Sequence, residues 1–158
     1  MVAAAKMRRA QDNMEKARPY ASKLFEIINN LKSDIISLDL PLTETREVKR
    51  IAFVVITSDK GLAGSFNSSV LKKAQQEIDA LENIDVDVLC IGKKSSDFFK
   101  ARNYNVILNE SEFWNHLDFS TASTISKNIT DHFLDKQVDQ IRVIFNEFVN
   151  VATHNVLV

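Results

Sequence analysis

An unbroken heptad pattern of apolar residues runs through the first 38 residues of the chain. Its positions are spaced alternately by three and by four, which keeps them on one narrow side of a helix. They are Met7, Ala10, Met14, Ala17, Ala21, Leu24, Ile28, Leu31, Ile35 and Leu38. A helix over residues 1–38 would be about 57 Å long at roughly 1.5 Å per residue, and no second segment of the sequence is long enough to cover it. The pattern therefore predicts one strand of a coiled coil whose partner helix comes from elsewhere.

This helix is expected to run without interruption up to a linker. Pro19 lies inside it, and a proline removes one helix hydrogen bond and bends the helix. Because the apolar pattern stays in register across Pro19, one bent helix is favoured over two. Residues 39–41 end the helix. We expect residues 39–49 to form a charged linker to a globular domain over 50–158.

Beyond the linker, the pattern changes to short apolar runs that alternate with segments of helical spacing. The predicted strands are 50–57, 86–91, 105–108 and 140–145, followed by an extended segment over 151–158, and the predicted helices are 66–81, capped by Asn67 or Ser68, 94–101 and 121–134. Alternating strands and helices imply right-handed crossovers. The fold class is therefore α/β: a long N-terminal coiled-coil helix joined to a Rossmann-like, mostly parallel sheet domain with alternating helices.

The composition is that of an ordinary folded protein, 45% hydrophobic and 26% charged with a net charge of −1. These values exclude a disordered chain and a protein that binds nucleic acid with its whole surface. The charge is unevenly distributed, however. Residues 1–38 hold seven basic and four acidic residues, a net +3, and the remainder holds 13 basic and 17 acidic residues, a net −4. The basic part of the chain is therefore the predicted helix.

The single cysteine, Cys90, rules out an internal disulfide and fits a reducing compartment. No apolar run approaches the roughly 18 residues of a membrane span. The basic residues near the start are not followed by the apolar core of a signal peptide. The sequence stops in the apolar run 156–158, and because domains seldom end inside a strand, we expect the C-terminus to be truncated.

The best candidate for chemistry is the turn over residues 58–65, directly after the first predicted strand. Ligand sites in open parallel sheets lie at the carboxyl ends of strands. The turn contains Lys60, Gly61 and Gly64, but it matches neither G-x-G-x-x-G nor G-x-x-x-x-G-K-[ST]. We therefore favour a structural role, a tight turn whose glycines permit positive φ angles and close helix packing.

The remaining reactive residue types do not form a recognisable site. The three histidines are scattered, with no carboxylate or cysteine at metal-ligand spacing; they are His116, His132 and His154. Cys90 lies in a strand run and is expected to be an inert core residue. Phe113 and Trp114 are expected to anchor a loop. The sequence therefore predicts no catalytic, cofactor-binding or metal-binding residues.

Lys6, Arg8 and Arg9 form a basic group at the start of the helix. Most such groups are solvated helix faces. Here the neighbouring heptad positions are alanines, and they become leucine and isoleucine from Leu24 onward. Because alanine lets two helix axes approach closely, we expect a rod that is slender and basic at one end. Such a rod suits an acidic or carbonyl-lined hole, whereas coiled coils that enter a nucleic-acid groove usually carry their basic block beyond the zipper.

Three segments together resemble the gamma subunit family of F-type ATP synthases, the central stalk of the rotor. They are residues 1–11 (MVAAAKMRRAQ), 17–21 (ARPYA) and 57–67 (TSDKGLAGSFN). Their order is that of the family, and the resemblance covers essentially all 158 residues. The third segment is similar to the family's internal signature, and we call residues 58–67 the signature turn. Its characteristic residues here are Ser58, Asp59, Lys60, Gly61, Leu62, Gly64 and Asn67.

The resemblance implies a rotor subunit without catalytic residues or cofactor, which turns inside a hexamer of alpha and beta subunits and couples proton flow to ATP synthesis. It implies that Lys6, Arg8 and Arg9 are candidates for contacts with the hexamer. It also implies that the sheet domain lies against the epsilon subunit and the c-ring, with no nucleic acid as partner. The complex would place the chain peripherally at the cytoplasmic face of a bacterial inner membrane. The signature turn would then be structural or an interface.

The sequence departs from the family at both ends. The family has a stretch before the position of Met1 and a long C-terminal helix, the coiled-coil partner, after the position of Val158. We therefore expect a fragment or a truncated gene product. Ala63 stands where relatives often have cysteine, which argues against a thiol role at that position. The cysteine-bearing regulatory insert of chloroplast forms is not seen.

Two other interpretations stay open. The turn after the first strand would suit a small nucleotide-binding α/β domain, with the helix as its dimerisation arm. The heptad pattern alone would suit a homodimeric coiled-coil adaptor.

Overall fold

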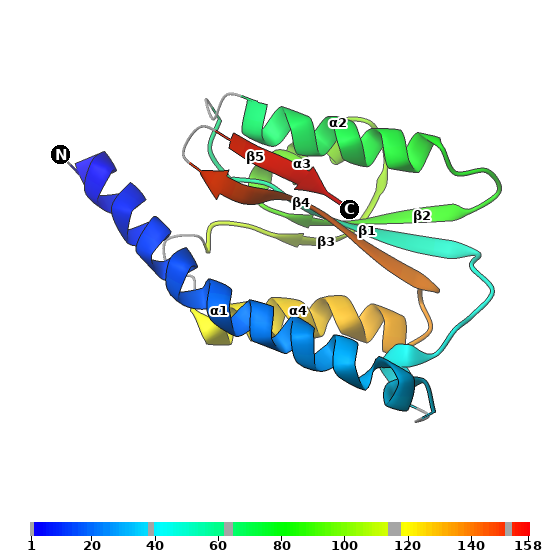
Figure 1. Ribbon diagram of the computed structural model, residues 1–158. Helices are drawn as coiled ribbons and strands as arrows, with labels where there is room; N and C mark the ends of the chain where they lie inside the picture. The colour runs from blue at the N-terminus through cyan, green and yellow to red at the C-terminus, as the bar shows by residue number, and fades with distance from the viewer. Residues whose placement is uncertain (1, 38–39, 62–64, 114–117, 151–152) are drawn as a thin grey trace. The chain divides into compact units, whose positions relative to one another are not determined.

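The structure is a computed structural model that describes residues 2–37, 40–61, 65–113, 118–150 and 153–158, and only the backbone of 2–4, 6–7, 32–37 and 150. It divides into two units, Met1–Glu44 and Thr45–Val158 (Figure 1).

The first unit is built on one long helix. α1 (Val2–Ser37) contains 36 residues and continues through Pro19, so the prediction of a single uninterrupted helix is confirmed. A short 3-10 turn, η1 (Pro41–Thr43), follows, in which the backbone N–H of Thr43 donates to the carbonyl of Leu40. The predicted end of the helix at residues 39–41 lies partly outside the described residues.

The second unit is an α/β domain with one five-stranded sheet. Its strand order is β3-β2-β1-β4-β5. The elements are β1 (Arg50–Ile56), α2 (Ser65–Asp79), β2 (Asp85–Ile91), α3 (Lys93–Lys100), β3 (Asn105–Glu110), α4 (Phe119–Leu134), β4 (Gln140–Asn150) and β5 (Thr153–Leu157). β3, β2, β1 and β4 run parallel to one another, and β5 returns antiparallel to β4. The sheet is therefore mixed, with the mostly parallel order that the sequence predicts.

The direction in which the sheet grows reverses once. The chain places β2 and β3 on one side of β1 and then crosses to place β4 on the other side. Right-handed crossovers in opposite directions put their helices on opposite faces. Figure 1 shows this arrangement, with α2 and α3 on one face of the sheet and α4 on the other. The carboxyl ends of β1 and β4 therefore form the switch point of the sheet, where ligands bind in many open α/β folds.

β1 is the centre of the hydrophobic core, because residues 51–55 are buried on both faces of the sheet. On the face of α2 and α3, Phe53 packs with Phe99 and Ile144. On the face of α4, Val54 packs with Leu89 and with partly buried residues of α4. Burial on both faces explains why the β1 sequence is continuously apolar rather than alternating.

Two local predictions need correction. Asn67 and Ser68 lie inside α2, so neither caps its N-terminus. The Asn67 side chain instead bonds to the preceding loop, as described below. The second correction concerns β4, which extends to Asn150 instead of ending at residue 145, because the hairpin with β5 continues its pairing past the parallel ladder.

Candidate functional site

The signature turn lies at the carboxyl end of β1 and is tied to the first turn of α2. The Ser58 backbone N–H donates to Asn67 Oδ1 at 3.0 Å, and Asn67 Nδ2 donates to Ser58 Oγ at 2.9 Å. Ser58 Oγ lies 2.7 Å from the carbonyl oxygen of Lys60. These bonds explain why an amide side chain stands at position 67. It has both a donor and an acceptor, and it uses both to hold the loop.

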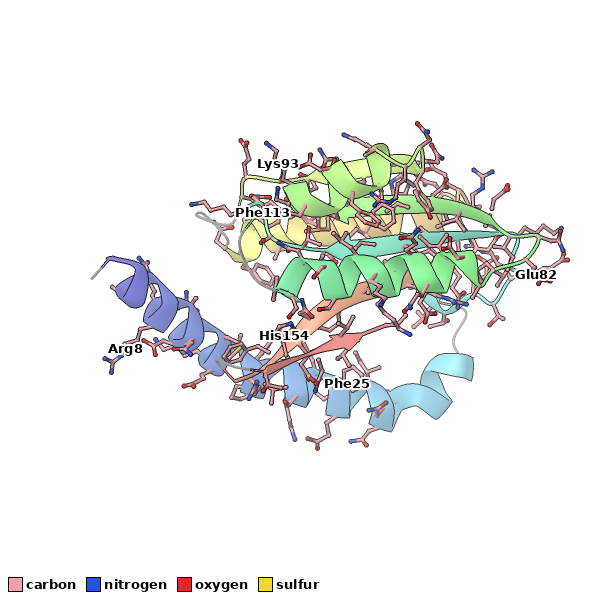
Figure 2. The ribbon with its side chains drawn as sticks, turned by 90° about the horizontal axis from the view of Figure 1, so that it is seen from above. Arg8, Phe25, Glu82, Lys93, Phe113 and His154 are labelled. Carbon is pink, nitrogen blue, oxygen red and sulfur yellow. The ribbon has the colours of Figure 1, made fainter. Side chains whose placement is uncertain are left out.

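Asp59 joins three loops that are far apart in the sequence. Its Oδ1 accepts the backbone N–H of Lys93 at 2.8 Å, and its Oδ2 accepts the backbone N–H of Glu112 at 2.8 Å. Lys93 begins α3 and Glu112 follows β3, so one carboxylate links the loops after β1, β2 and β3. Figure 2 shows Lys93 and Phe113 at one end of the domain, with Glu82 at the opposite end. Asp59 therefore stabilises the carboxyl edge of the sheet.

The glycine that this edge requires is Gly92. It has a φ of +101°, and a Cβ added there would lie 2.1 Å from the carbonyl oxygen of Thr57. Thr57 also accepts the backbone N–H of Ser95 through its Oγ1 at 2.8 Å. The turn between β2 and α3 is therefore packed directly against the end of β1, at a distance that no side chain at position 92 would allow.

The prediction that the turn's own glycines permit positive φ is wrong for Gly61. Among the described residues, Gly92 is the glycine with a positive φ. A Cβ at Gly61 would meet the Lys94 side chain at 3.6 Å, an ordinary contact. Leu62, Ala63 and Gly64 lie outside the described residues. The positive φ falls at position 92 because the close approach is made there, by the β2–α3 turn.

A cavity of about 340 Å³ opens at the switch point between β1 and β4. It lies beyond Ile144, the last β4 residue that pairs with β1. The lining residues are Ile56, Thr57, Ser58, Phe66, Phe145 and Asn146. Asn146 Nδ2 donates to the carbonyl of Phe66 at 2.6 Å, which holds β4 to the start of α2.

Among the described residues near this cavity, two of the features that bind phosphates are lacking. Phosphates bind where backbone N–H groups at a helix N-terminus are available or where cations converge. At the N-terminus of α3 the Lys93 N–H is already taken by the Asp59 carboxylate, whose negative charge would also repel a phosphate. The described cavity lining has no cationic residue.

The other candidate residues occupy structural positions. Cys90 is buried in β2, and burial raises the pKa of its thiol to about 11, so it stays protonated at neutral pH. His132 Nδ1 lies 2.6 Å from Gln137 Oε1, and the His154 ring packs edge-on against Phe66. Phe113 packs against the core on the α4 face, and Trp114 and His116 lie outside the described residues.

No group of three or more metal-ligating side chains occurs within the part of the chain that the structure describes. In the same part of the chain, every helix is too short or too polar to span a lipid bilayer.

The heptad pattern forms an exposed stripe along α1. Of its larger members with described side chains, Leu24 is 41% exposed, Ile28 53% and Leu31 45%. Ala10, Ala17 and Ala21 are exposed and Met14 is half-buried. The side chains of Met7, Ile35 and Leu38 lie outside the described residues. Large uncovered apolar surfaces mark places where another molecule or segment binds.

The apolar surface of α1 is wider than the heptad pattern indicates. Tyr20, Phe25 and Ile27 are not heptad positions, yet they are 69%, 70% and 46% exposed. Their positions on the helix could have been found in the sequence by plotting all apolar residues around a helical wheel. Arg8 and Arg9 are exposed near the start of α1, where Figure 2 shows the Arg8 side chain projecting from the helix. The side chain of Lys6 is outside the described residues.

These features define a class of protein: a doubly wound α/β domain joined to a long helix with exposed apolar surface. A family model described as ATP synthase matches residues 1–158. The ATP synthase gamma chain of Chloroherpeton thalassium is 42% identical over 164 residues, covering 99% of this chain and 54% of its own. The gamma chain of Desulforamulus reducens is 37% identical, covering 97% of this chain and 53% of its own.

The chain is also similar to solved structures of ATP synthase rotors. The central stalk and c-ring structure of the Tetrahymena thermophila mitochondrial ATP synthase aligns with a TM-score of 0.73 and 26% identity, covering 99% of this chain and 67% of that one. A rotor structure of the Euglena gracilis mitochondrial enzyme, at 15% identity and a TM-score of 0.53, shares the fold. The chain therefore belongs to the ATP synthase family, among its gamma chains. It spans about half the length of the curated relatives that it matches.

Proposed function

We propose that this chain is part of the central-stalk rotor subunit of a proton-translocating F-type ATP synthase. It couples proton flow to ATP synthesis by turning inside the alpha–beta hexamer. The observation that carries the proposal is α1, a 36-residue helix with an exposed apolar stripe, in a chain whose residues 1–158 all match the family model. The subunit has no catalytic residue or cofactor of its own. It acts through its orientation: whichever catalytic subunit it faces is shifted toward one conformation.

In this proposal α1 is one strand of a coiled coil. The second strand is a helix from the part of the protein beyond the matched half, since the curated relatives are nearly twice as long as this chain. The alanines at positions 10, 17 and 21 support a slender end, because small side chains let helix axes approach. Lys6, Arg8 and Arg9 are the candidate contacts with carbonyl and carboxylate groups of the hexamer.

The α/β domain is the base of the rotor, against the epsilon subunit and the c-ring. The Tetrahymena structure, in which a central stalk accompanies a c-ring, supports this assignment. The chain is then peripheral to the membrane, at the cytoplasmic face of a bacterial inner membrane. The bonds of Asp59 and Asn67 support a structural role for the signature turn, because they use its polar groups to join loops.

The test is association with the hexamer. A chimera in which these residues replace the matching part of the Chloroherpeton thalassium gamma chain is expected to co-purify with alpha and beta subunits of that organism and to stimulate their ATP hydrolysis. Replacing Arg8 and Arg9 by glutamate should weaken both effects. The matched control replaces Lys72 and Lys100, exposed cations on α2 and α3, by glutamate. Failure of the unmodified chimera to associate would contradict the proposal.

The cavity at the switch point favours a second candidate, a nucleotide-binding domain with a helical arm. Calorimetry of the whole chain with ATP, GTP and NAD separates the two. The rotor proposal expects no saturable binding, and a micromolar dissociation constant for one of these nucleotides would favour the second candidate.

A further inference from the structure

We propose that Arg46 is a positioning residue of the rotor. It anchors the chain that arrives from α1 onto the end of the sheet, so that load on this chain reaches the whole α/β domain. This inference rests on the proposed function. The contacts that carry it, which we call the Arg46 clamp, are made by Arg46, Lys49 and Arg50 with Phe133, Val138 and Asp139.

Arg46 reaches across to the end of α4 and to the loop that follows it. Its Nη1 donates to the carbonyl of Phe133 at 2.9 Å and to the carbonyl of Val138 at 3.2 Å. Its guanidinium carbon lies 4.1 Å from the centre of the Phe133 ring. Carbonyls at a helix C-terminus carry partial negative charge, so the cation is favoured there. A planar guanidinium can stack on a ring and donate at its edge at once, which a lysine cannot do.

Asp139 supplies the other half of the clamp. Its Oδ2 accepts the backbone N–H groups of Lys49 and Arg50, each at 2.9 Å, and its own N–H donates to the carbonyl of Arg50 at 2.9 Å. The bonds from Lys49 and Arg50 lower the pKa of Asp139 below its ordinary value. The chain from residue 46 to 50 is therefore held at both ends by the segment that joins α4 to β4.

The clamp lies where force from α1 would enter the α/β domain. The boundary between the two units falls between Glu44 and Thr45, directly before Arg46. Force that travels along the chain from α1 meets Arg46 before it meets β1. Because Arg46 bonds to residues 87 and 92 positions away, that force is shared with α4 and with the segment that leads into β4, instead of pulling on the first residue of β1 alone. The clamp thus fixes residues 46–50 to the α/β domain.

The chain contains a matched control. Arg102 places its guanidinium carbon 3.6 Å from the centre of the Phe98 ring and donates to the Phe98 carbonyl at 3.2 Å. The chemistry is the same, but its partner is only four residues away, so Arg102 joins no distant segments. Replacing Arg102 by methionine removes the same kinds of contact without opening the junction.

The experiment compares Arg46→Met, Arg46→Lys and Arg102→Met in the chimeric gamma chain, assembled into the complete synthase. Amide exchange at Lys49 and Arg50 is expected to be about tenfold faster in Arg46→Met, the factor that corresponds to losing about 1.4 kcal/mol. With the hexamer fixed to a surface and ATP absent, the angular fluctuations of a bead on the c-ring should be at least about twofold wider in Arg46→Met, the direct sign of a compliant junction, and Arg46→Lys should resemble Arg46→Met. Arg102→Met should match the unmodified chimera in both measurements.

Two further variants keep the test decisive if Arg46→Met folds poorly. Phe133→Tyr keeps the ring and the carbonyl and should behave as the unmodified chimera, whereas Phe133→Leu removes the ring and should raise the exchange rates. Unchanged exchange in Arg46→Met and Phe133→Leu would overturn the clamp. Faster exchange with unchanged angular fluctuations would overturn its role in the rotor. An unmodified chimera that assembles but does not pump would instead refute the proposed function, and with it any load on Arg46.

Discussion

Replacing Gly92 by alanine tests how the carboxyl edge of the sheet is assembled. The new Cβ would lie 2.1 Å from the carbonyl oxygen of Thr57 and 2.7 Å from its carbonyl carbon. Both are backbone atoms at the end of the central strand, and the Thr57 N–H bonds to the Ile91 carbonyl at 2.8 Å. Thr57 therefore cannot move away without disturbing the pairing of β1 with β2.

The expected loss in the free energy of unfolding has two sources. A side chain held at a φ of +101°, where L-residues are rarely found, costs roughly 1–3 kcal/mol. Forcing a close-packed neighbour to shift costs about 1–3 kcal/mol more. We expect a total of about 4 kcal/mol, a large part of the roughly 5–15 kcal/mol that stabilises a domain.

The assay is urea unfolding followed by circular dichroism, with Gly61→Ala as the control. Among the described residues, a Cβ at Gly61 meets only the flexible end of the Lys94 side chain, at 3.6 Å, and no positive φ is required there. Gly61→Ala should therefore change the stability by less than about 1 kcal/mol. A Gly92→Ala variant as stable as the unmodified chain, or two variants equally destabilised, would refute the reasoning.

Three other outcomes are expected. Asp59→Ala should speed amide exchange at Lys93 and Glu112 together and cost roughly 1–3 kcal/mol, whereas accelerated exchange at one site alone would mean that the loops are not coupled through Asp59. Cys90 should react with a thiol reagent only as fast as the domain unfolds, because it is buried and its pKa is raised to about 11; fast labelling of the folded chain would contradict this. Because the pKa of Asp139 in the folded chain is below its ordinary value of 3.8, its carboxylate stabilises the fold at pH values above 3.8, and this stability is lost as the pH falls below 3.8. Asp139→Asn should therefore make the free energy of unfolding less dependent on pH in the acid range.

The sequence was most informative where a long pattern reports on one element. The heptad positions predicted an uninterrupted helix, and α1 is that helix. The apolar run over residues 50–57 predicted a strand, and β1 is that strand, buried on both faces. These patterns succeed because each residue's environment repeats along the element, so every position adds independent support.

The sequence was least informative where distant loops meet. The signature turn drew attention to its own glycines, but Gly61 has no positive φ and the close approach to Thr57 is made by Gly92. Nothing near Gly92 in the sequence shows that Thr57 will lie against it. In the same way, Asp59 looks like an ordinary loop residue until the chain brings N–H groups 34 and 53 residues away to its carboxylate. Such contacts depend on the tertiary arrangement and leave no local pattern.

The most direct measurement of the central claim is rotation. A bead attached to the α/β domain of the chimeric gamma chain, in a hexamer fixed to a surface, is predicted to turn in one direction when ATP is added and to stop when ATP is removed. A bead that stays still, or that diffuses in both directions while the hexamer hydrolyses ATP, would contradict the assignment of this chain to the rotor.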